Sequence, residues 1–254
     1  MGTLFVVATP LGTLGDLSAR ASEELRRVPV VAAEDTRVTR KLLSHLGASP
    51  RLISYHEDSP ESHLEAVLAA LEAGDVALTT DAGTPGLSDP GAALVREAAA
   101  RGHEVVPLPG PSAVTALLSV SGLAANRFLF LGFLPRSGAD RRRVLRDAVL
   151  ETGAVVFFEA PHRVRDALED IAAAFGDRPL VIGRELTKLH EEVFRGTAAS
   201  ARAHFTAPRG EFVIAVEGAP ERAEEIADAG IEAAIARLKA SGLGGRTLVD
   251  RAVA

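Results

Sequence analysis

The chain has 254 residues, of which 47% are hydrophobic and 24% charged, so it can bury a sizeable core in one large or two smaller domains. It contains no cysteine, which excludes disulfides, thiolate nucleophiles and cysteine-ligated zinc. Its net charge of −6 argues against binding nucleic acid through overall positive charge but leaves room for a local basic patch. The sequence has neither an apolar run of roughly 20 residues nor a signal-peptide pattern, which predicts a cytoplasmic protein without a membrane segment.

Short apolar runs alternate with helical patterns from the N-terminus to about residue 121. The strand patterns lie at 4–8, 28–33, 51–54, 76–80 and 104–106, and a loop and a helical pattern follow each of them. This β-α-β-α alternation predicts a mainly parallel sheet with helices on its faces. We expect it to form an N-terminal α/β domain, residues 1–121.

Two loops of this first half are rich in Gly and Pro: residues 81–91 and residues 107–113. Such residues suit a backbone that turns sharply or approaches a ligand. Because the carboxyl ends of parallel strands meet at one edge of a sheet, the two loops should form one crevice, where ligands bind in open α/β folds. Asp81 could anchor a polar ligand group or simply form the turn. Asp89 and Ser112 have the pattern of helix N-caps.

The second half begins after a gap at 122–127, where we expect the domain boundary. Strand patterns at 128–133, 154–158, 179–182, 193–195 and 211–216, with helical patterns at 141–150 and 164–175, predict a C-terminal α/β domain with a mixed sheet, residues 127–218. An amphipathic helical pattern at 221–240 opens a helical tail, residues 221–254.

Polar residues at strand ends are the candidates for chemistry. Glu34, Asp35 and Arg37 follow the second strand pattern, where they could cap a helix or recognise a polar substrate. Glu185 and Lys188 stand three residues apart and could form either an ion pair or an acid–base site.

The densest basic cluster lies beside the expected boundary, and it could be a solvated helix face or a set of phosphate contacts. It consists of Arg136, Arg141, Arg142, Arg143 and Arg146. The histidines have no metal-ligand spacing, so we expect no metal site. The chain also lacks a G-x-G-x-x-G motif after a strand, a Walker motif, H-E-x-x-H and G-x-S-x-G, which removes support from the common dinucleotide-binding, NTPase, zinc-protease and hydrolase classes.

Seven short motifs occur in a fixed order across most of the chain. They are ATPLG (8–12), AEDTR (33–37), DAGTP (81–85), SDPG (88–91), PLPGP (107–111), GRELTK (183–188) and GEFV (210–213). The set resembles the ribosomal RNA-modifying branch of the tetrapyrrole methylase superfamily. The resemblance implies a two-domain α/β fold that binds S-adenosyl-L-methionine between its domains and forms a homodimer.

The same resemblance implies a reaction and a set of site residues. The reaction is methylation of the ribose 2′-hydroxyl of a cytidine in the decoding region of 16S ribosomal RNA, within the small ribosomal subunit. Residues that match the cofactor-binding motifs are Pro10, Gly12, Asp81, Gly83, Thr84, Ser112 and Ala113, with Phe158 as an adenine-side wall.

Methyl transfer to a ribose needs a group that helps the hydroxyl proton to leave. The polar strand ends offer Glu34, Asp35, Glu159, Glu185 and Lys188, and we favour Glu185 with Lys188. Arg37 and Arg184 are expected to hold the flanking phosphates, together with the basic cluster.

Two other functions stay open: a tetrapyrrole methyltransferase acting on a small molecule, and a non-catalytic S-adenosylmethionine-binding protein. The latter would give the polar residues no reason to converge on one cleft. Those residues are Glu34, Asp35, Arg184, Glu185 and Lys188.

Overall fold

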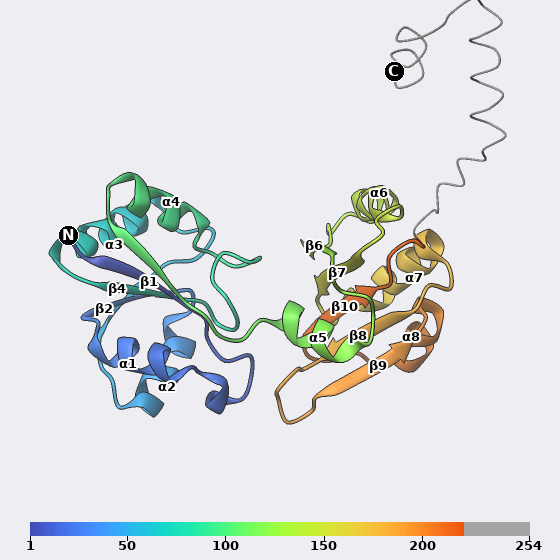
Figure 1. Ribbon diagram of the computed structural model, residues 1–254, viewed down its shortest axis with the longest axis horizontal. Coiled ribbons are helices and arrows are strands. Elements are labelled where there is room, and N and C mark those ends of the chain that lie inside the picture. Colours follow the sequence, from blue (N-terminus) through green and yellow to red (C-terminus); the bar gives the residue numbers. More distant parts are fainter. Residues whose placement is uncertain (221–254) are drawn as a thin grey trace, which may run out of the picture. The chain divides into compact units, whose positions relative to one another are not determined.

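The computed structural model of the protein describes residues 1–220 (Figure 1). Met1–Gly218 forms one compact unit. The amphipathic helix expected at 221–240, and the rest of the tail, lie outside the described residues. In the described part of the chain, no helix is both long enough and apolar enough to cross a membrane.

The first sheet has five parallel strands, as the alternating pattern predicts, so the expected parallel sheet is confirmed. The strand order is β3-β2-β4-β1-β5, with β1 (Thr3–Val7), β2 (Val30–Ala33), β3 (Arg51–Ser54), β4 (Val76–Thr79) and β5 (Glu104–Leu108). The central strand β4 is buried along its whole length, because helices cover both faces of the sheet.

Helices α1 (Ala19–Arg27) and α2 (Thr36–Leu46) cover one face of this sheet, and α3 (Glu61–Ala73) and α4 (Ala92–Ala100) cover the other (Figure 1). Buried aliphatic side chains on all four helices face the sheet. The short 3-10 helix η1 (Leu14–Asp16) lies in the loop after β1. Each parallel strand therefore feeds a loop at one common edge of the sheet.

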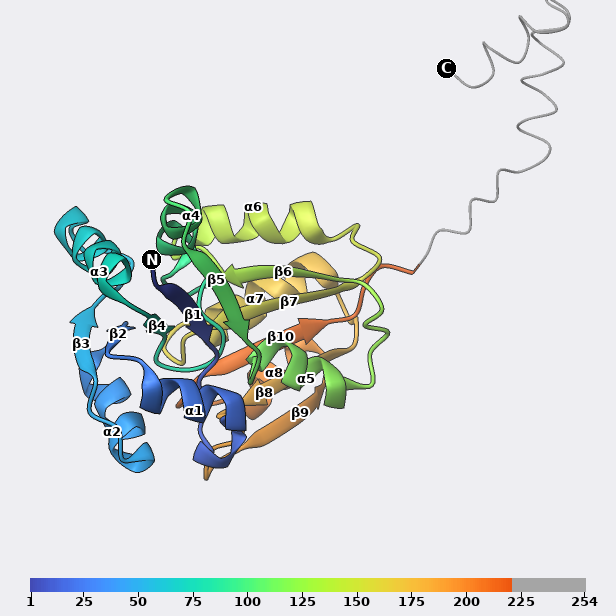
Figure 2. The same ribbon diagram turned by 60° about the vertical axis from the view of Figure 1, so that its left-hand side comes forward.

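The second sheet is mixed, as predicted. Its order is β6-β7-β10-β8-β9, with β6 (Phe128–Phe133), β7 (Ala154–Glu159), β8 (Leu180–Arg184), β9 (Glu192–Gly196) and β10 (Phe212–Val216) (Figure 2). Strands β6 and β7 are parallel, and the other pairs are antiparallel. Helices α6 (Gly138–Ala148), α7 (Val164–Phe175) and α8 (Ala198–His204) pack on one face of the sheet around Phe157 and Ile214.

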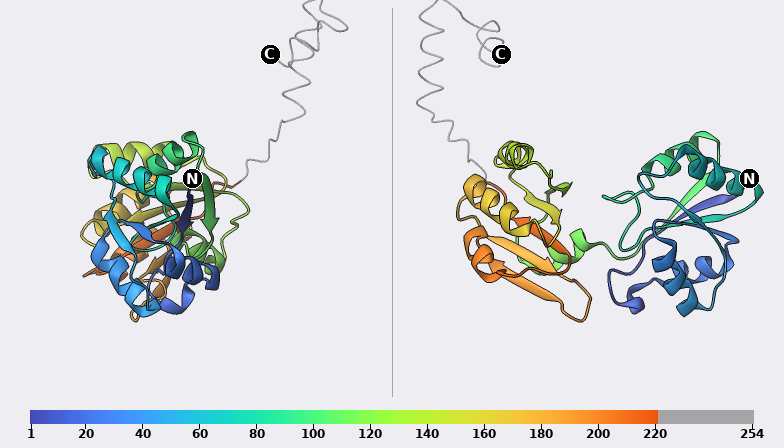
Figure 3. Two further views of the ribbon diagram at one scale, coloured as in Figure 1. Left: turned by 90° about the vertical axis from the view of Figure 1, so that its left-hand side faces the viewer. Right: turned by 180° about the vertical axis from the view of Figure 1, so that it is seen from behind.

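Helix α5 (Ala113–Ser121) covers the opposite face of the second sheet, and it lies beside that sheet in the right-hand view of Figure 3. Its Val114 and Leu117 pack with Val156 of β7 and Val213 of β10. The chain therefore leaves the first sheet after β5 and packs on the second sheet from α5 onward. This change lies earlier along the chain than the expected boundary at 122–127.

Candidate active site

Three loops at the carboxyl edge of the first sheet are bonded to one another. Thr9 and Gly83 exchange two backbone hydrogen bonds, with N···O distances of 2.8 and 3.1 Å. The Thr84 hydroxyl donates to the Pro111 carbonyl oxygen at 3.2 Å. The loops after β1, β4 and β5 therefore lie together, as their Gly- and Pro-rich sequences predict.

The loop after β1 also touches the loop after β8 of the second sheet. A Cβ atom placed on Gly12 would lie 2.3 Å from Cγ of Lys188, so a side chain at this position would displace the lysine. The Thr13 hydroxyl donates to the Thr187 carbonyl oxygen at 2.6 Å. The two sheets meet here through backbone and small side chains.

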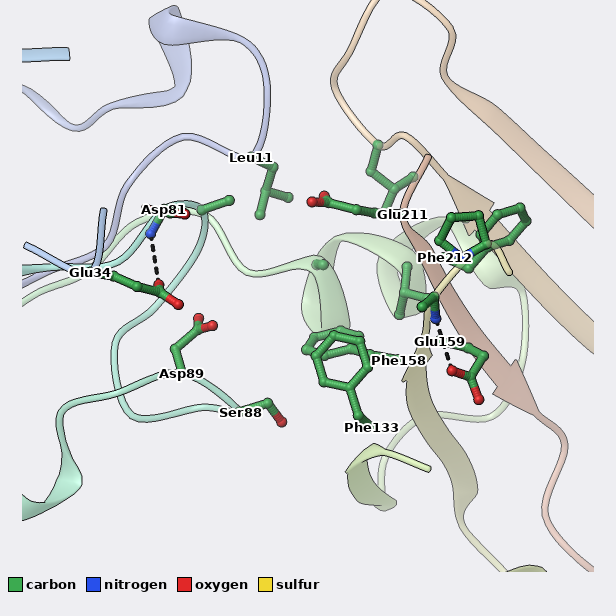
Figure 4. Close-up of a pocket in the computed structure, with 17 residues that line it drawn as sticks. Leu11, Glu34, Asp81, Ser88, Asp89, Phe133, Phe158, Glu159, Glu211 and Phe212 are labelled. Carbon is green, nitrogen blue, oxygen red and sulfur yellow. Dashed lines mark hydrogen bonds between the residues drawn. The ribbon is translucent and has the colours of Figure 1, made fainter. Parts of the chain in front are cut away.

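A cavity of about 430 Å³ lies between the loops of the two sheets (Figure 4). This volume suits a small-molecule ligand. Its apolar lining includes Leu11, Ala113, Phe133, Phe158 and Leu186, and its polar lining includes the carboxylates of Glu34, Asp81, Asp89, Glu159 and Glu211. An adjoining cavity of about 210 Å³ shares Leu11 and Asp81 and is lined by Pro10 and Gly12.

The larger cavity is strongly acidic: five carboxylates line it and no lysine or arginine does. Burial raises the pKa of Glu34, Asp81 and Glu159. Burial, followed by repulsion from Glu34, Asp81 and Glu211, raises the pKa of Asp89 to about 7. Such shifts show that ionised carboxylates are costly in this cavity, and a cationic ligand would relieve the cost.

Backbone amides orient two of these carboxylates. Asp81 N donates to Oε2 of Glu34 at 3.1 Å, and Asp35 N donates to Oδ1 of Asp81 at 3.1 Å. Asp35 itself caps helix α2, because its Oδ1 accepts from Arg37 N at 2.7 Å and its Oδ2 pairs with the Arg37 guanidinium at 2.6 Å. The Arg37 bonds hold the pKa of Asp35 at about 2. The residues of the AEDTR motif (33–37) therefore have two different roles. Glu34 lines the cavity, whereas Asp35 and Arg37 form the start of helix α2.

Glu185 and Lys188 form an ion pair, and neither group has a pKa shifted toward neutral pH. Lys188 Nζ lies 2.9 Å from Oε1 of Glu185 and 2.8 Å from Oε2 of Glu211, and Glu211 N donates to Glu185 at 2.9 Å. Burial opposes the charge on Glu185, but the Glu211 and Lys188 bonds outweigh it and lower its pKa. The same ion pairs outweigh burial at Lys188 and raise its pKa. Of the three groups, Glu211 lines the cavity.

Aromatic rings form the wall on the side of the second sheet. Phe158 lies edge-on to Phe130 and Phe133, with ring centroids 5.0 and 5.5 Å apart. Phe133 is 54% exposed and follows an irregularity in β6, where Gly132 has φ +64°. A Cβ on Gly132 would lie 2.7 Å from the Ser88 hydroxyl oxygen, so this bulge fits closely against the loop after β4.

The expectation that Asp89 caps the next helix is wrong. Helix α4 begins at Ala92 with Gly91 as its N-cap residue, and Gly91 has φ +143°, a conformation that favours glycine. The intervening Pro90 and Gly91 move the helix start beyond the reach of Asp89, whose carboxylate instead points toward the cavity (Figure 4). Ser112 does take the N-cap position of α5, but its side chain makes no capping bond.

The basic cluster separates into buried and exposed members. Arg141 is only 7% exposed, and its Nε donates to Asp170 at 2.7 Å, because α6 begins at Gly138 and turns this side chain toward α7. A phosphate contact by Arg141 would require this ion pair to open. Arg143 is exposed but pairs with Asp140 at 2.9 Å. Arg136, Arg142 and Arg146 are also exposed, and Arg184 pairs with Glu192 at 2.9 Å.

The candidates from the sequence therefore occupy three settings. The larger cavity contains Glu34, Asp81, Ala113, Phe158 and Glu159, and the adjoining one contains Pro10 and Gly12. The surrounding loops contain Asp35, Gly83, Thr84, Ser112, Glu185 and Lys188, and the arginines lie outside both linings. Sequence reasoning missed Asp89, Phe133 and Glu211. The available signals were the SDPG and GEFV motifs and the Gly that interrupts the Phe-rich strand pattern.

The chain belongs to the tetrapyrrole (corrin/porphyrin) methylase family, whose model matches residues 3–202. It is 43% identical over 248 residues to the ribosomal RNA small subunit methyltransferase I of Synechocystis sp., covering 96% of this chain and 89% of the relative. It is 47% identical over 227 residues to the protein of the same name from Xylella fastidiosa strain Temecula1, covering 87% and 83%.

The fold is that of solved methyltransferases. Uroporphyrin-III C-methyl transferase from Thermus thermophilus, complexed with S-adenyl homocysteine, matches with a TM-score of 0.60 at 18% identity, covering 85% of this chain and 92% of that one. At this identity the likeness concerns the fold alone.

Proposed function

We propose that this protein transfers a methyl group from S-adenosylmethionine to the ribose 2′-hydroxyl of a cytidine in 16S ribosomal RNA, within the small ribosomal subunit. The similarity to ribosomal RNA small subunit methyltransferases I, at 43–47% identity over most of the chain, carries the substrate assignment. The acidic cavity supports the cofactor assignment independently of the relatives' names.

The cavity fits S-adenosylmethionine in charge. This cofactor carries a positive sulfonium and a positive ammonium group, and five carboxylates but no lysine or arginine line the cavity. Asp81 would hold a ribose hydroxyl or the amino group, and Phe158 would pack against the adenine. Gly12, Gly83, Thr84 and Ser112 shape the loops that bring these groups together. When bound, the cofactor supplies an electrophilic methyl group that needs no activation by the protein.

The protein must therefore position the ribose hydroxyl and help its proton to leave. Glu34, Asp35, Glu185 and Lys188 remain candidates for this task. The double ion pair around Lys188 favours a positioning role for Glu185 and Lys188, since together they hold the Glu211 carboxylate at the cavity. Asp35 similarly orients Asp81 through its backbone amide.

This convergence also favours an enzyme over a non-catalytic binding protein. Glu34 lines the cavity directly, Asp35 contacts Asp81, and the Glu185–Lys188 pair contacts Glu211. A scaffold protein would not require polar residues from both sheets to surround one cavity.

RNA binding is proposed for the exposed arginines. Arg136, Arg142, Arg143 and Arg146 lie on or just before α6, which directly follows the strand that carries Phe133. Arg37 and Arg184 are proposed to contact flanking phosphates. Local phosphate contacts are compatible with the negative overall charge because the steering field is set by nearby groups.

The test is incubation of the protein with labelled S-adenosylmethionine and small subunits that lack the modification, followed by mapping of the labelled nucleotide. Label at a cytidine 2′-oxygen is expected. Label appearing instead on a tetrapyrrole offered in parallel would contradict the RNA assignment. The homodimer implied by the family resemblance is tested separately by light scattering of the full chain.

A further inference from the structure

Phe133, the last residue of β6, is 54% exposed although it lines the larger cavity. The alternation of a regular strand would place it on the other face of the sheet. Leu129 and Leu131 of the same strand pack into the core beneath α6, α7 and α8, whereas Phe130 packs on the opposite face with α5. Two residues beyond Leu131, a regular strand would turn the Phe133 ring toward the first of these cores.

A bulge of one residue reverses this direction. Phe130 pairs with Val156 of β7, but Phe133 pairs with Phe158, so β6 contains one residue more than β7 between the two pairs. Gly132, with φ +64°, lies within this bulge. Bulges re-aim side chains and are common beside active sites. The ring of Phe133 accordingly lies edge-on to that of Phe158, on the cavity side of the sheet (Figure 4).

Contacts on both sides hold the bulge in place. Gly132 lies so close to Ser88, in the loop after β4, that an added Cβ would be 2.7 Å from the serine hydroxyl oxygen. Beyond the exposed ring, the Arg163 guanidinium donates to the carbonyl oxygens of Leu134 and Pro135. An aromatic side chain on a fixed backbone loses little conformational entropy when a planar partner covers it.

Exposed arginines follow this ring directly along the chain. Arg136 stands three residues after Phe133, and helix α6 then carries Arg142 and Arg146, all with exposed side chains. An exposed aromatic ring beside arginines suits single-stranded RNA, because the ring stacks on a base while the guanidinium groups contact phosphates.

Resting on the proposed function, we propose that Phe133 stacks on the base of the nucleotide whose ribose is methylated. This base is bonded to C1′, the neighbour of the carbon that carries the reacting hydroxyl, so it lies close to the methyl donor. Phe133 lines the cavity proposed for that donor. The nucleotide leaves its own stack to reach the site, and the ring replaces a stacking partner that it loses. Phe133 is thus a positioning residue for the acceptor and takes no part in the bonds that form and break.

The first test is methyl transfer to small subunits that lack the modification, at saturating cofactor, with calorimetry of cofactor binding and thermal unfolding measured alongside. Phe133→Ala should lower kcat/KM for the subunits by about 5- to 150-fold, the loss expected for one base–aromatic stack, mainly through a higher KM. Phe133→Tyr keeps the ring and should stay close to the wild type. Phe133→Leu keeps an apolar contact without the ring and should recover only a small part of the loss.

The matched control is Phe128→Ala. Phe128 is 43% exposed and lies on the same strand, but it does not line the cavity. This variant should transfer methyl groups as the wild type does.

A second test locates the base without catalysis. Ultraviolet light joins bases to aromatic side chains that stack on them, so the protein, saturated with S-adenosylhomocysteine, is irradiated on small subunits that lack the modification. Peptide mapping should find the target cytidine joined to Phe133. A link from that cytidine to a peptide without Phe133 would overturn the proposal.

The outcomes separate this proposal from the proposed function. A Phe133→Ala or Phe133→Leu protein that retains the wild-type kcat/KM would overturn the stacking role and leave methylation of the RNA intact. So would a Phe133→Ala protein that loses cofactor affinity alone, since the ring would then serve the cofactor. A wild-type protein that transfers no methyl group to small-subunit RNA would contradict the proposed function itself.

Discussion

The affinity for S-adenosylmethionine should fall as the pH is lowered through 7. Asp89 lines the proposed cofactor cavity, and its pKa is raised to about 7. A bound sulfonium would favour the ionised carboxylate and lower this pKa. Below the pKa of the free protein, binding must first remove a proton, so acid weakens binding. Above that pKa, the carboxylate is already ionised and the affinity no longer changes.

The size of the effect follows from the linkage between proton and ligand binding. If bound cofactor keeps Asp89 ionised throughout, affinity relative to its high-pH limit falls about two-fold at pH 7 and about ten-fold at pH 6, for a free pKa of about 7. Binding should release about half a proton at pH 7 and about 0.9 at pH 6. At lower pH, the raised pKa values of Glu34, Asp81 and Glu159 would steepen the loss.

Calorimetry between pH 5.5 and 8.5, in buffers of different ionisation enthalpy, measures both the affinity and the proton release. S-adenosylhomocysteine is the matched control, since it lacks the sulfonium charge and should show a smaller pH dependence. Asp89→Asn should flatten the curve for S-adenosylmethionine between pH 6 and 8. A flat wild-type curve, or equal slopes for the two ligands, would refute the electrostatic reasoning.

Three further predictions concern the surroundings of the cavity. Asp170→Ala leaves the buried Arg141 guanidinium without its partner and should lower the free energy of unfolding by about 3–5 kcal/mol, measured with urea; a loss below 1 kcal/mol would contradict a buried ion pair. Gly132→Ala should weaken both cofactor binding and the stability of the fold. The control Gly122→Ala, at a glycine with a similar positive φ but open space around it, should lower only the free energy of unfolding, by about 1–2 kcal/mol. Equal cofactor affinities in the two variants would show that the fit of the β6 bulge does not matter to the site. Arg143→Gln should reduce the salt dependence of RNA binding by about 0.7–0.9 in logarithmic slope without changing cofactor affinity; an unchanged slope would identify its exposed side chain as an ordinary helix surface.

Much of the fold could be predicted because it is encoded in local patterns. The parallel sheet follows from apolar runs such as β4, each separated from the next by a helical pattern. The observed strand order allows the connecting helices to cover both faces of the sheet. The placement of α5 could not be predicted in the same way. Its apolar side chains, including Leu117, would suit the face of either sheet, and only the tertiary structure assigns them to the second.

The site shows the same division between local and long-range information. Motifs at strand ends predicted that the loops containing Asp81 and Ser112 would meet, because parallel strands bring their carboxyl ends together. Glu211 was missed because it lies at the start of an antiparallel strand, and its place at the cavity depends on the reverse direction of β10. Reasoning from strand carboxyl ends alone cannot find such a residue.

The position of Asp89 depends on a shift of only a few residues in the start of a helix. An aspartate before proline has a strong N-cap pattern, and the carboxylate of an N-cap aspartate accepts hydrogen bonds from backbone amides of the first helical turn. Because Gly91 adopts φ +143°, the helix starts at Ala92 and its first amides are out of reach of Asp89. The carboxylate that loses this structural role lies among Glu34, Asp81 and Glu211, where ionisation is costly. A residue that local rules assign to stability is thereby left free for chemistry, and sequence patterns alone give no means of telling the two cases apart.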